Sequence, residues 1–247
     1  NTKIIGGSDW DSINQISIDK NNKIVVSGQT KNVLDTQKSY GDFDNFLQKY
    51  DLNLNKEWTK TYGTNQYDGS YSFAFDKHNN IHHISTSAGD NSAKSSTGTY
   101  VNVFQSNGNF LAKKLYEDQF NGLRQIIFND DGTSYLAGQN SKSKIYISKA
   151  DMEGTIQEYK TYSTLANDWF VGITKNANDL YTFGWTLGKI SNPNSTNTGV
   201  MTGYIIKNSL DLTPPKIKGP TGDAGANSSS KSVNEHSTTV HTFSANE

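Results

Sequence analysis

The sequence has no cysteine, no long apolar run and almost no net charge. Without cysteine the chain cannot form disulfide cross-links or thiolate zinc sites, although this absence leaves the cellular compartment open. A membrane-spanning helix needs about 18 consecutive apolar residues, and because no such run occurs we expect no membrane insertion in this segment. The formal net charge of −1 creates no overall field that would attract nucleic acid, so we expect no nucleic-acid partner.

The motifs of common catalytic sites are also missing. The sequence contains neither a nucleophile elbow of the G-x-S-x-G type nor a metalloprotease motif of the H-E-x-x-H type. We therefore predict that the chain has no catalytic residues and is not an enzyme.

What the sequence does contain is a fourfold repeat. Each copy starts at an Asp or Asn, runs through a strand pattern to a second Asp or Asn, and continues through a turn into a second strand. The copies cover residues 11–28, 68–85, 121–138 and 168–184. Their period is roughly 45 to 58 residues, which with about four strands per copy is typical of β-propeller blades. A single blade cannot bury its own faces, so the copies must pack on one another.

The residue patterns predict an all-β fold class, a β-propeller of four-stranded antiparallel blades with four blades. In the first copy Ile16 and Ile18 share one face of a strand, and the polar residues 19–22 form a tight turn. The predicted strands of this copy are 12–19, 24–30, 44–51 and 56–62. The third strands of the later copies are predicted at 99–105, 144–150 and 201–207, and the fourth strands at 110–116 and 156–162.

The last copy lacks a fourth strand of its own. Pro214 and Pro215 follow its third strand, and proline removes a backbone donor and fixes φ. The N-terminal residues 2–6 align with residues 59–63, the fourth strand of the first copy. We therefore expect 2–6 to pair with 201–207 and close a ring of four blades. The alternative is that these blades belong to a larger ring.

The composition changes after residue 210. Gly, Ser, Asn and Pro are enriched in residues 208–232, which is typical of a linker. The predicted organisation is a β-propeller at 1–210, a linker at 211–232 and the start of an incomplete β-sandwich at 233–247. We expect residues 211–247 to make few contacts with the propeller.

Three features together resemble the SBBP-type bacterial β-propeller repeat. This repeat carries G-x-D-x-F and K-x-D elements, a following Trp and a Tyr-Gly step into the next blade. The matching segments are residues 41–51, residues 57–63 and the spacing from Asp68 through Asp76 to Ile81. The resemblance covers about residues 1–210 and is strongest in the first copy.

The C-terminal residues resemble the opening of a cadherin-like or Ig-like module of bacterial surface proteins, through residues 214–220, 232–235 and 243–247. Together the two resemblances imply a large secreted or cell-surface protein, often adhesive, with an extracellular or cell-surface location. They carry no catalytic residues. A Glu in the position of Glu235 can bind Ca²⁺ in cadherin-like modules, so the resemblance implies a calcium ligand there.

A second set of candidate metal ligands comes from the repeat itself. Each copy places one acidic or amide side chain directly before its first strand, namely Asp11, Asp68, Asn121 and Asp168. If these side chains gather at one mouth of a central channel, their oxygens suit Ca²⁺. The alternative is that each side chain caps its own turn by accepting a local backbone N–H.

The loops between second and third strands are the predicted binding surface. These loops, at 31–43, 88–98, 140–143 and 186–200, differ sharply in length, and insertions gather where binding is tolerated or selected. Their candidate ligand-binding residues are Tyr40, Asn91, Lys94, Lys189 and Asn194, a polar set suited to a glycan or a surface protein.

The leading interpretation is a non-catalytic propeller module with an adhesion, scaffold or spacer role. The alternative is a carbohydrate-active propeller, a glycan-binding protein or a glycosidase, that uses the aspartates at the channel mouth. A glycosidase needs two carboxyl groups about 5 to 9.5 Å apart, one of them with a raised pKa. Aspartates that face solvent in a deep pocket would favour catalysis, whereas aspartates bonded to their own turns would favour the scaffold.

Overall fold

The computed structural model describes residues 2–87, 98–117, 120–140, 142, 144–176, 179–189, 196, 199–208, 228–231 and 241–244. The chain forms two compact units, residues 1–210 and residues 211–247. In the second unit, strands β16 (Ser228–Lys231) and β17 (His241–Ser244) form an antiparallel pair. No helix long and apolar enough to cross a membrane occurs in the described part of the chain.

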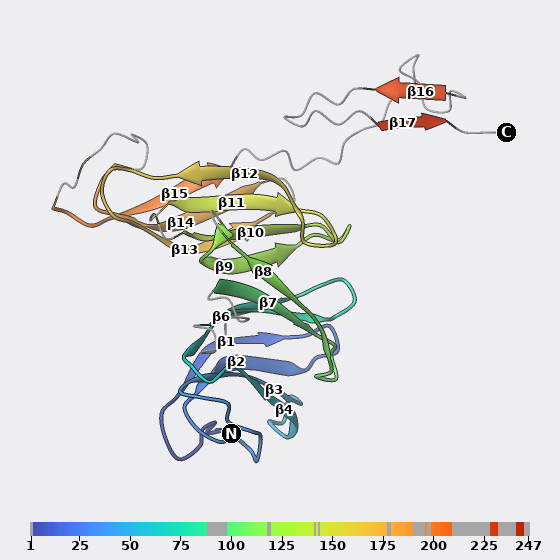
Figure 1. The fold of residues 1–247 in the computed structure, drawn as a ribbon, viewed down its shortest axis with the longest axis vertical. Helices are drawn as coiled ribbons and strands as arrows, with labels where there is room; N and C mark the ends of the chain where they lie inside the picture. Colours follow the sequence, from blue (N-terminus) through green and yellow to red (C-terminus); the bar gives the residue numbers. More distant parts are fainter. Residues whose placement is uncertain are drawn as a thin grey trace. The chain divides into compact units, whose positions relative to one another are not determined.

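The first unit consists of four antiparallel sheets arranged as the blades of a β-propeller, and in each sheet the strands pair in sequence order (Figure 1). The first blade contains β1 (Asp11–Ile18), β2 (Ile24–Thr30), β3 (Asp44–Tyr50) and β4 (Lys56–Tyr62). The second contains β5 (Asp68–Phe75), β6 (Ile81–Ser87), β7 (Gly98–Phe104) and β8 (Phe110–Tyr116). The third contains β9 (Leu123–Phe128), β10 (Ser134–Gln139), β11 (Ile145–Ala150) and β12 (Ile156–Tyr162). The fourth contains β13 (Asp168–Lys175), β14 (Leu180–Thr186) and β15 (Thr202–Asn208).

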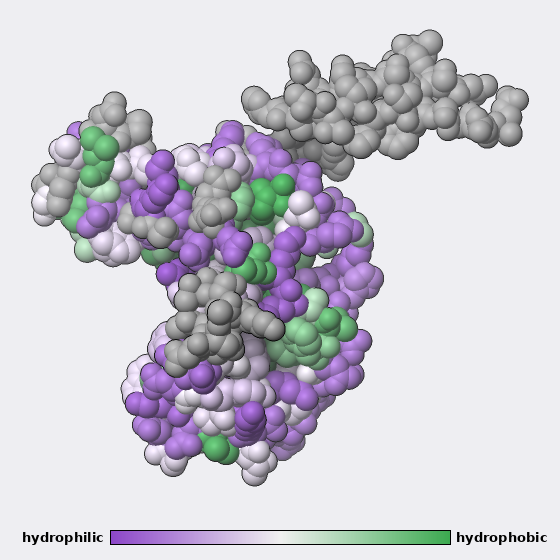
Figure 2. Space-filling view, viewed as in Figure 1, coloured by the Kyte–Doolittle hydropathy of each residue, from purple (hydrophilic) through white to green (hydrophobic). Residues whose placement is uncertain are grey.

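This architecture confirms the all-β propeller fold predicted from the repeat. The first strands of successive blades contact one another, so β1, β5, β9 and β13 are the inner strands. On the surface in view, hydrophilic residues dominate, and hydrophobic residues form only small separate groups (Figure 2).

The predicted closure of the ring by residues 2–6 is wrong. Among the described residues the last blade has three strands, and residues 2–6 form no strand. The N-terminal segment stays with the first blade instead, because Ile5 packs on its hydrophobic cluster and Gly7 donates its N–H to Asp11 Oδ2 at 2.7 Å. Local packing thus outweighs the resemblance of this segment to a fourth strand.

Several hairpin turns form because an aspartate at the start of the turn binds backbone N–H groups within it. Asp19 Oδ1 accepts the backbone N–H groups of Asn21 and Lys23, and Asn22 takes the left-handed conformation with φ of 56°. The same pattern recurs at Asp51, where Oδ1 accepts two N–H groups of the turn. Asp and Asn are favoured here because their short side chains bond the backbone two to four residues on.

Glutamine side chains join neighbouring blades through the edge of the inner strand. Gln15 on β1 bonds both backbone polar groups of Phe73 on β5, with Nε2 donating at 3.0 Å and Oε1 accepting at 2.8 Å. Gln125 on β9 repeats this contact by accepting the N–H of Ile173 on β13 at 2.9 Å. These bonds satisfy backbone groups that have no strand partner on the inner edge, so they fix how each blade sits against the next.

A buried ion pair also holds the first two blades together. Lys49 Nζ lies 2.7 Å from Asp19 Oδ2, with side-chain exposures of 4% and 1%, and donates to the carbonyl and hydroxyl oxygens of Ser106 in the second blade. Burial acts to raise the pKa of Asp19, but the bond from Lys49 and two backbone N–H groups lower it below its usual value. The two charged groups therefore have hydrogen-bond partners in both blades.

Removing one partner of this pair leaves a buried charge uncompensated, which costs about 3–5 kcal/mol. We expect Lys49→Met to lower the free energy of unfolding by about this amount in urea titrations. The matched control is Lys23→Met, which removes the more exposed pair with Glu57 and should leave the free energy of unfolding almost unchanged. Equal losses in the two variants would show that the Lys49 pair does not hold the junction.

Candidate functional site

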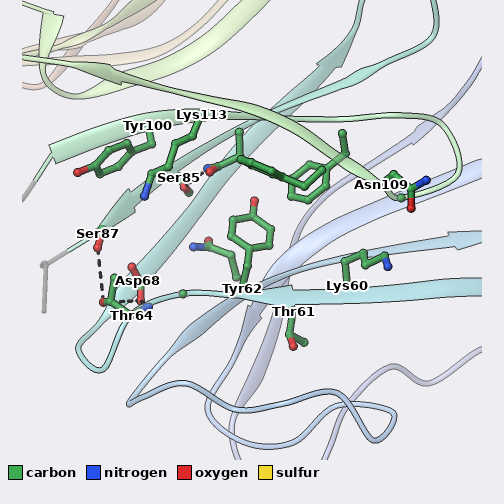
Figure 3. A pocket seen from close by; sticks show the side chains of 16 residues that line it. Lys60, Thr61, Tyr62, Thr64, Asp68, Ser85, Ser87, Tyr100, Asn109 and Lys113 are labelled. Carbon is green, nitrogen blue, oxygen red and sulfur yellow. Dashed lines mark hydrogen bonds between the residues drawn. The ribbon is translucent and has the colours of Figure 1, made fainter. Parts of the chain in front are cut away.

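A pocket with a volume of about 380 Å³ lies between the first two blades (Figure 3). Strands β3 and β4 form one wall, strands β6, β7 and β8 form the other, and the segment that crosses from β4 to β5 closes one end. The lining residues are Asn45, Lys60, Thr61, Tyr62, Gly63, Thr64, Asp68, Ser85, Ser87, Tyr100, Asn102, Phe104, Gly108, Asn109, Phe110 and Lys113.

Tyr62 points from β4 into the pocket towards the second blade (Figure 3). Its hydroxyl bonds His83 Nδ1, and Ser70 Oγ lies 2.9 Å from His83 Nε2. Burial raises the pKa of Tyr62 well above its usual value and lowers the pKa of His83 to about 3. The histidine is therefore neutral at physiological pH. In this form Nδ1 can accept a hydrogen bond from the Tyr62 hydroxyl, while Nε2–H donates to Ser70 Oγ.

Lys113 supplies a positive charge to the opposite wall. Its Nζ lies 3.7 Å from the centroid of the Tyr100 ring, a cation–π contact. Burial lowers the pKa of Lys113, and the carboxylate of Asp68 acts in the opposite direction. No carboxylate forms an ion pair with Lys113 within the described ranges, so its ammonium group keeps donors available to a ligand.

An amide oxygen in the wall of the pocket has no hydrogen-bond donor. Asn45 on β3 is only 1% exposed, and its Oδ1 is buried without a partner. Nearby, Asn102 on β7 donates from Nδ2 to Ser85 Oγ at 2.8 Å. A buried acceptor without a donor costs about 1–3 kcal/mol, so a ligand that draws the Asn45 amide towards the pocket and brings it a donor recovers this cost.

Two buried carboxylates lie beside Gly63 at the closed end of the pocket. A Cβ at this position would lie 2.2 Å from Asp44 Oδ1 and 2.8 Å from Asp68 Oδ2, so only glycine fits. Burial raises the pKa of Asp44, opposed by hydrogen bonds from Tyr40, Gly41 and Ser39, and the charge of Asp68 raises it further. Asp44 is not part of the pocket lining and Asp68 Oδ2 is bonded to Thr64, so neither presents a free carboxylate to the pocket.

The aspartates at the start of β5 and β13 cap the turns that precede them. Asp68 Oδ2 accepts the N–H of Thr64 at 2.6 Å and its hydroxyl at 2.9 Å. Asp168 makes the same two contacts with Thr164 and also accepts the hydroxyl of Thr186. A Thr four residues before the Asp thus fixes the crossing between two blades.

The other predicted metal ligands also have local partners. Asp11 accepts the N–H of Gly7 as described above, and Asn121 Oδ1 lies 3.1 Å from the hydroxyl of Thr99. Within the part of the chain that the structure describes, no three His, Asp or Glu side chains gather where they could share a metal ion. Asp11, Asp68 and Asp168 therefore stand apart, one in each of three blades. Glu235 lies outside the described residues.

The two predicted loop residues that the structure describes, Tyr40 and Lys189, do not line the pocket. Tyr40 is exposed, and its backbone N–H donates to Asp44 Oδ2 at 2.7 Å. Lys189 is exposed just beyond the end of β14. Asn91, Lys94 and Asn194 lie outside the described residues, so the binding-loop prediction stays a prediction.

Sequence reasoning missed the pocket because its walls come from two different copies of the repeat. Asn45 and Asn102 carried a usable signal, since an amide within a buried strand has no obvious role in packing. The comparison with family models found no match, and no curated protein matches the chain.

The buried histidine makes stability depend on pH. The pKa of His83 is about 3 in the folded chain and near 6.5 when unfolded, so its contribution is complete above about pH 6.5 and is lost as the pH falls towards 3. We expect His83→Gln, which cannot ionise, to flatten the fall of the melting temperature between pH 7 and pH 4.

The control is His78→Gln, because His78 is exposed in the turn before β6. This variant should keep the wild-type slope of melting temperature against pH. If His83→Gln and His78→Gln showed the same slope as the wild type, the buried neutral histidine would not be the cause.

Proposed function

We propose that residues 1–210 form a non-catalytic binding module of a larger secreted or cell-surface protein, and that the pocket between the first two blades binds a short saccharide. Adhesion to a glycan-bearing surface is the role that this module suits best. The observation that carries the proposal is the unpartnered Asn45 oxygen in a pocket walled by aromatic rings.

The pocket offers the two kinds of surface that a sugar ring needs. Phe110 is 57% exposed and packs on the buried Phe104 with ring centroids 5.6 Å apart, so it gives an apolar face for the C–H side of a sugar. Asn45 and Asn102 add amide groups for its hydroxyls. A few fixed polar groups in a largely apolar pocket are typical of small-ligand sites.

A saccharide also matches the charge of the site. The lining carries two cations, Lys60 and Lys113, and the single carboxylate of Asp68, so the pocket is mildly positive and disfavours a cation. Hydroxyl groups donate and accept, and one sugar can therefore serve both Asn45 Oδ1 and Lys113 Nζ. The pocket offers a ligand only a few contacts, and the entropy cost of association offsets part of their energy. Single-site affinity is therefore modest, as reversible adhesion requires.

The glycosidase alternative has less support. Hydrolysis needs two carboxyl groups that reach the substrate, one as acid and one as nucleophile or base. Asp68 is buried with its Oδ2 bonded to Thr64, and Asp44 is fully buried behind Gly63. The bonds of Asp68 and Asp168 to their own turns support a scaffold function for these aspartates.

A secreted or surface location is supported by the SBBP and cadherin-like resemblances of the sequence. In this proposal Ca²⁺ belongs to the downstream module through Glu235 and has no part in the pocket. The partner is a glycan on a surface protein or a cell wall.

The proposal is tested by screening the full chain against an array of neutral and acidic oligosaccharides and measuring affinity for a bound sugar by calorimetry. We expect Asn45→Leu to weaken that affinity about tenfold, because one ligand hydrogen bond of about 1.4 kcal/mol is lost. The same variant should keep or raise the melting temperature, since it removes a buried acceptor that has no donor in the free protein.

The control variant is Asn53→Leu, in the exposed turn between β3 and β4, which should leave the affinity unchanged. Absence of any saccharide ligand, or equal affinity in wild type and Asn45→Leu, would exclude this function for the pocket.

A further inference from the structure

The interface between blades is built in the same way three times. At each junction the inner strand of the following blade covers the sheet of the preceding blade, β5 on β1 and β2, β9 on β5 and β6, and β13 on β9 and β10. One position of the inner strand is deeply buried at every junction. It is occupied by Phe73, Ile126 and Ile173, with exposures of 5%, 6% and 3%.

The first blade leaves this position uncovered. Its equivalent residue is Ile16 on β1, which is 65% exposed, and Ile13 and Ile18 on the same strand are also more than half exposed. Three exposed isoleucines on one strand are unusual for a surface that faces only water. In the other blades, the residues at these positions of the inner strand pack on the sheet of the preceding blade.

The last blade leaves the other half uncovered. Phe183 on β14 and Ile205 on β15 are directly paired across the strands, with exposures of 39% and 78%. The equivalent pairs of the earlier blades are all at most 4% exposed under the next inner strand. These pairs are Ser27 with Leu47, Ile84 with Val101, and Ala137 with Ile147.

The uncovered face of the last blade is also more apolar than its counterparts. Trp185 lies two residues from Phe183 on the same face and stacks on Trp169, with ring centroids 3.6 Å apart. Trp185 stands where the first and third blades have Gln29 and Gln139, whose side chains bond the next blade. An aromatic surface thus replaces the polar contacts of the inner junctions.

A loop covers the outer part of the first blade but not β1. Leu34 is 1% exposed and packs with Val26, Phe46 and Tyr50, while Asp35 accepts hydrogen bonds from two side chains of the outer strands. The part left open is the inner strand. This is the same element that makes the contact at the three junctions inside the chain.

We propose that a second copy of this chain covers these surfaces, with β1 of one copy packed head to tail on the β13–β15 face of another. The two surfaces are the two halves of an interface that the chain itself already forms three times. Among the described residues, the first and last blades of one chain do not pack on each other as neighbouring blades do. A contact between unlike faces is heterologous, so it produces either a closed ring or a growing chain.

The test uses sedimentation of the full chain and of two variants, Ile16→Asp and Phe183→Asp. We expect the mass of the wild type to rise above the monomer with concentration, and each variant alone to remain a monomer. An equimolar mixture of the two variants should form a dimer that grows no further, because each copy then contributes one intact face. A face that paired with itself would not give this result.

Leu52→Asp is the matched control, because Leu52 is an exposed apolar residue of the β3–β4 turn away from both faces, and it should assemble like the wild type. Ile16→Asp and Phe183→Asp should keep the melting temperature that the wild type shows when dilute, which separates lost assembly from lost folding. A wild type that stays monomeric up to about 1 mM, or a mixture that stays monomeric, would overturn the proposal.

Discussion

The first three blades of this protein each depend on the following blade to bury one face of the sheet. The contact is carried by a single inner-strand position, filled by Phe73, Ile126 and Ile173, which is buried at all three junctions. Gln15 and Gln125 add hydrogen bonds to the backbone at this position, so the same few residues satisfy both the apolar and the polar requirements of the junction. Apolar side chains on a sheet face stabilise the fold only when they are removed from water. The number of covered faces therefore determines how stable each blade is.

The candidate site follows from the same constraint. Two blades that meet along their inner strands diverge towards their outer strands, and polar residues such as Asn45 and Lys113 can occupy that space without breaking the junction. The buried contacts of Tyr62 with His83 hold the floor of the pocket in place. The pocket is therefore preformed, which reduces the ordering cost of binding.

Much of the fold could be predicted from sequence because its signals are local. The first hairpin followed from the polar residues 19–22, whose turn the structure contains as expected. The closure by residues 2–6 could not be judged from local similarity, since packing of Ile5 with Leu34 depends on a loop whose path is not encoded in any short pattern. The pocket could not be predicted for a similar reason. Asn45 and Lys113 are distant in sequence and line the same pocket only when the two blades pack together.

The central claim is that the pocket between the first two blades binds a saccharide. Its most direct test is an NMR titration of the full chain with an oligosaccharide that it binds, in which backbone and side-chain amide signals are observed together. The account predicts the largest shifts at the side-chain amide of Asn45 and at the backbone amides of Tyr100 and Lys113, with none at Asp11 or Asp168. Shifts confined to the 31–43 loop around Tyr40, with Asn45 unmoved, would contradict it.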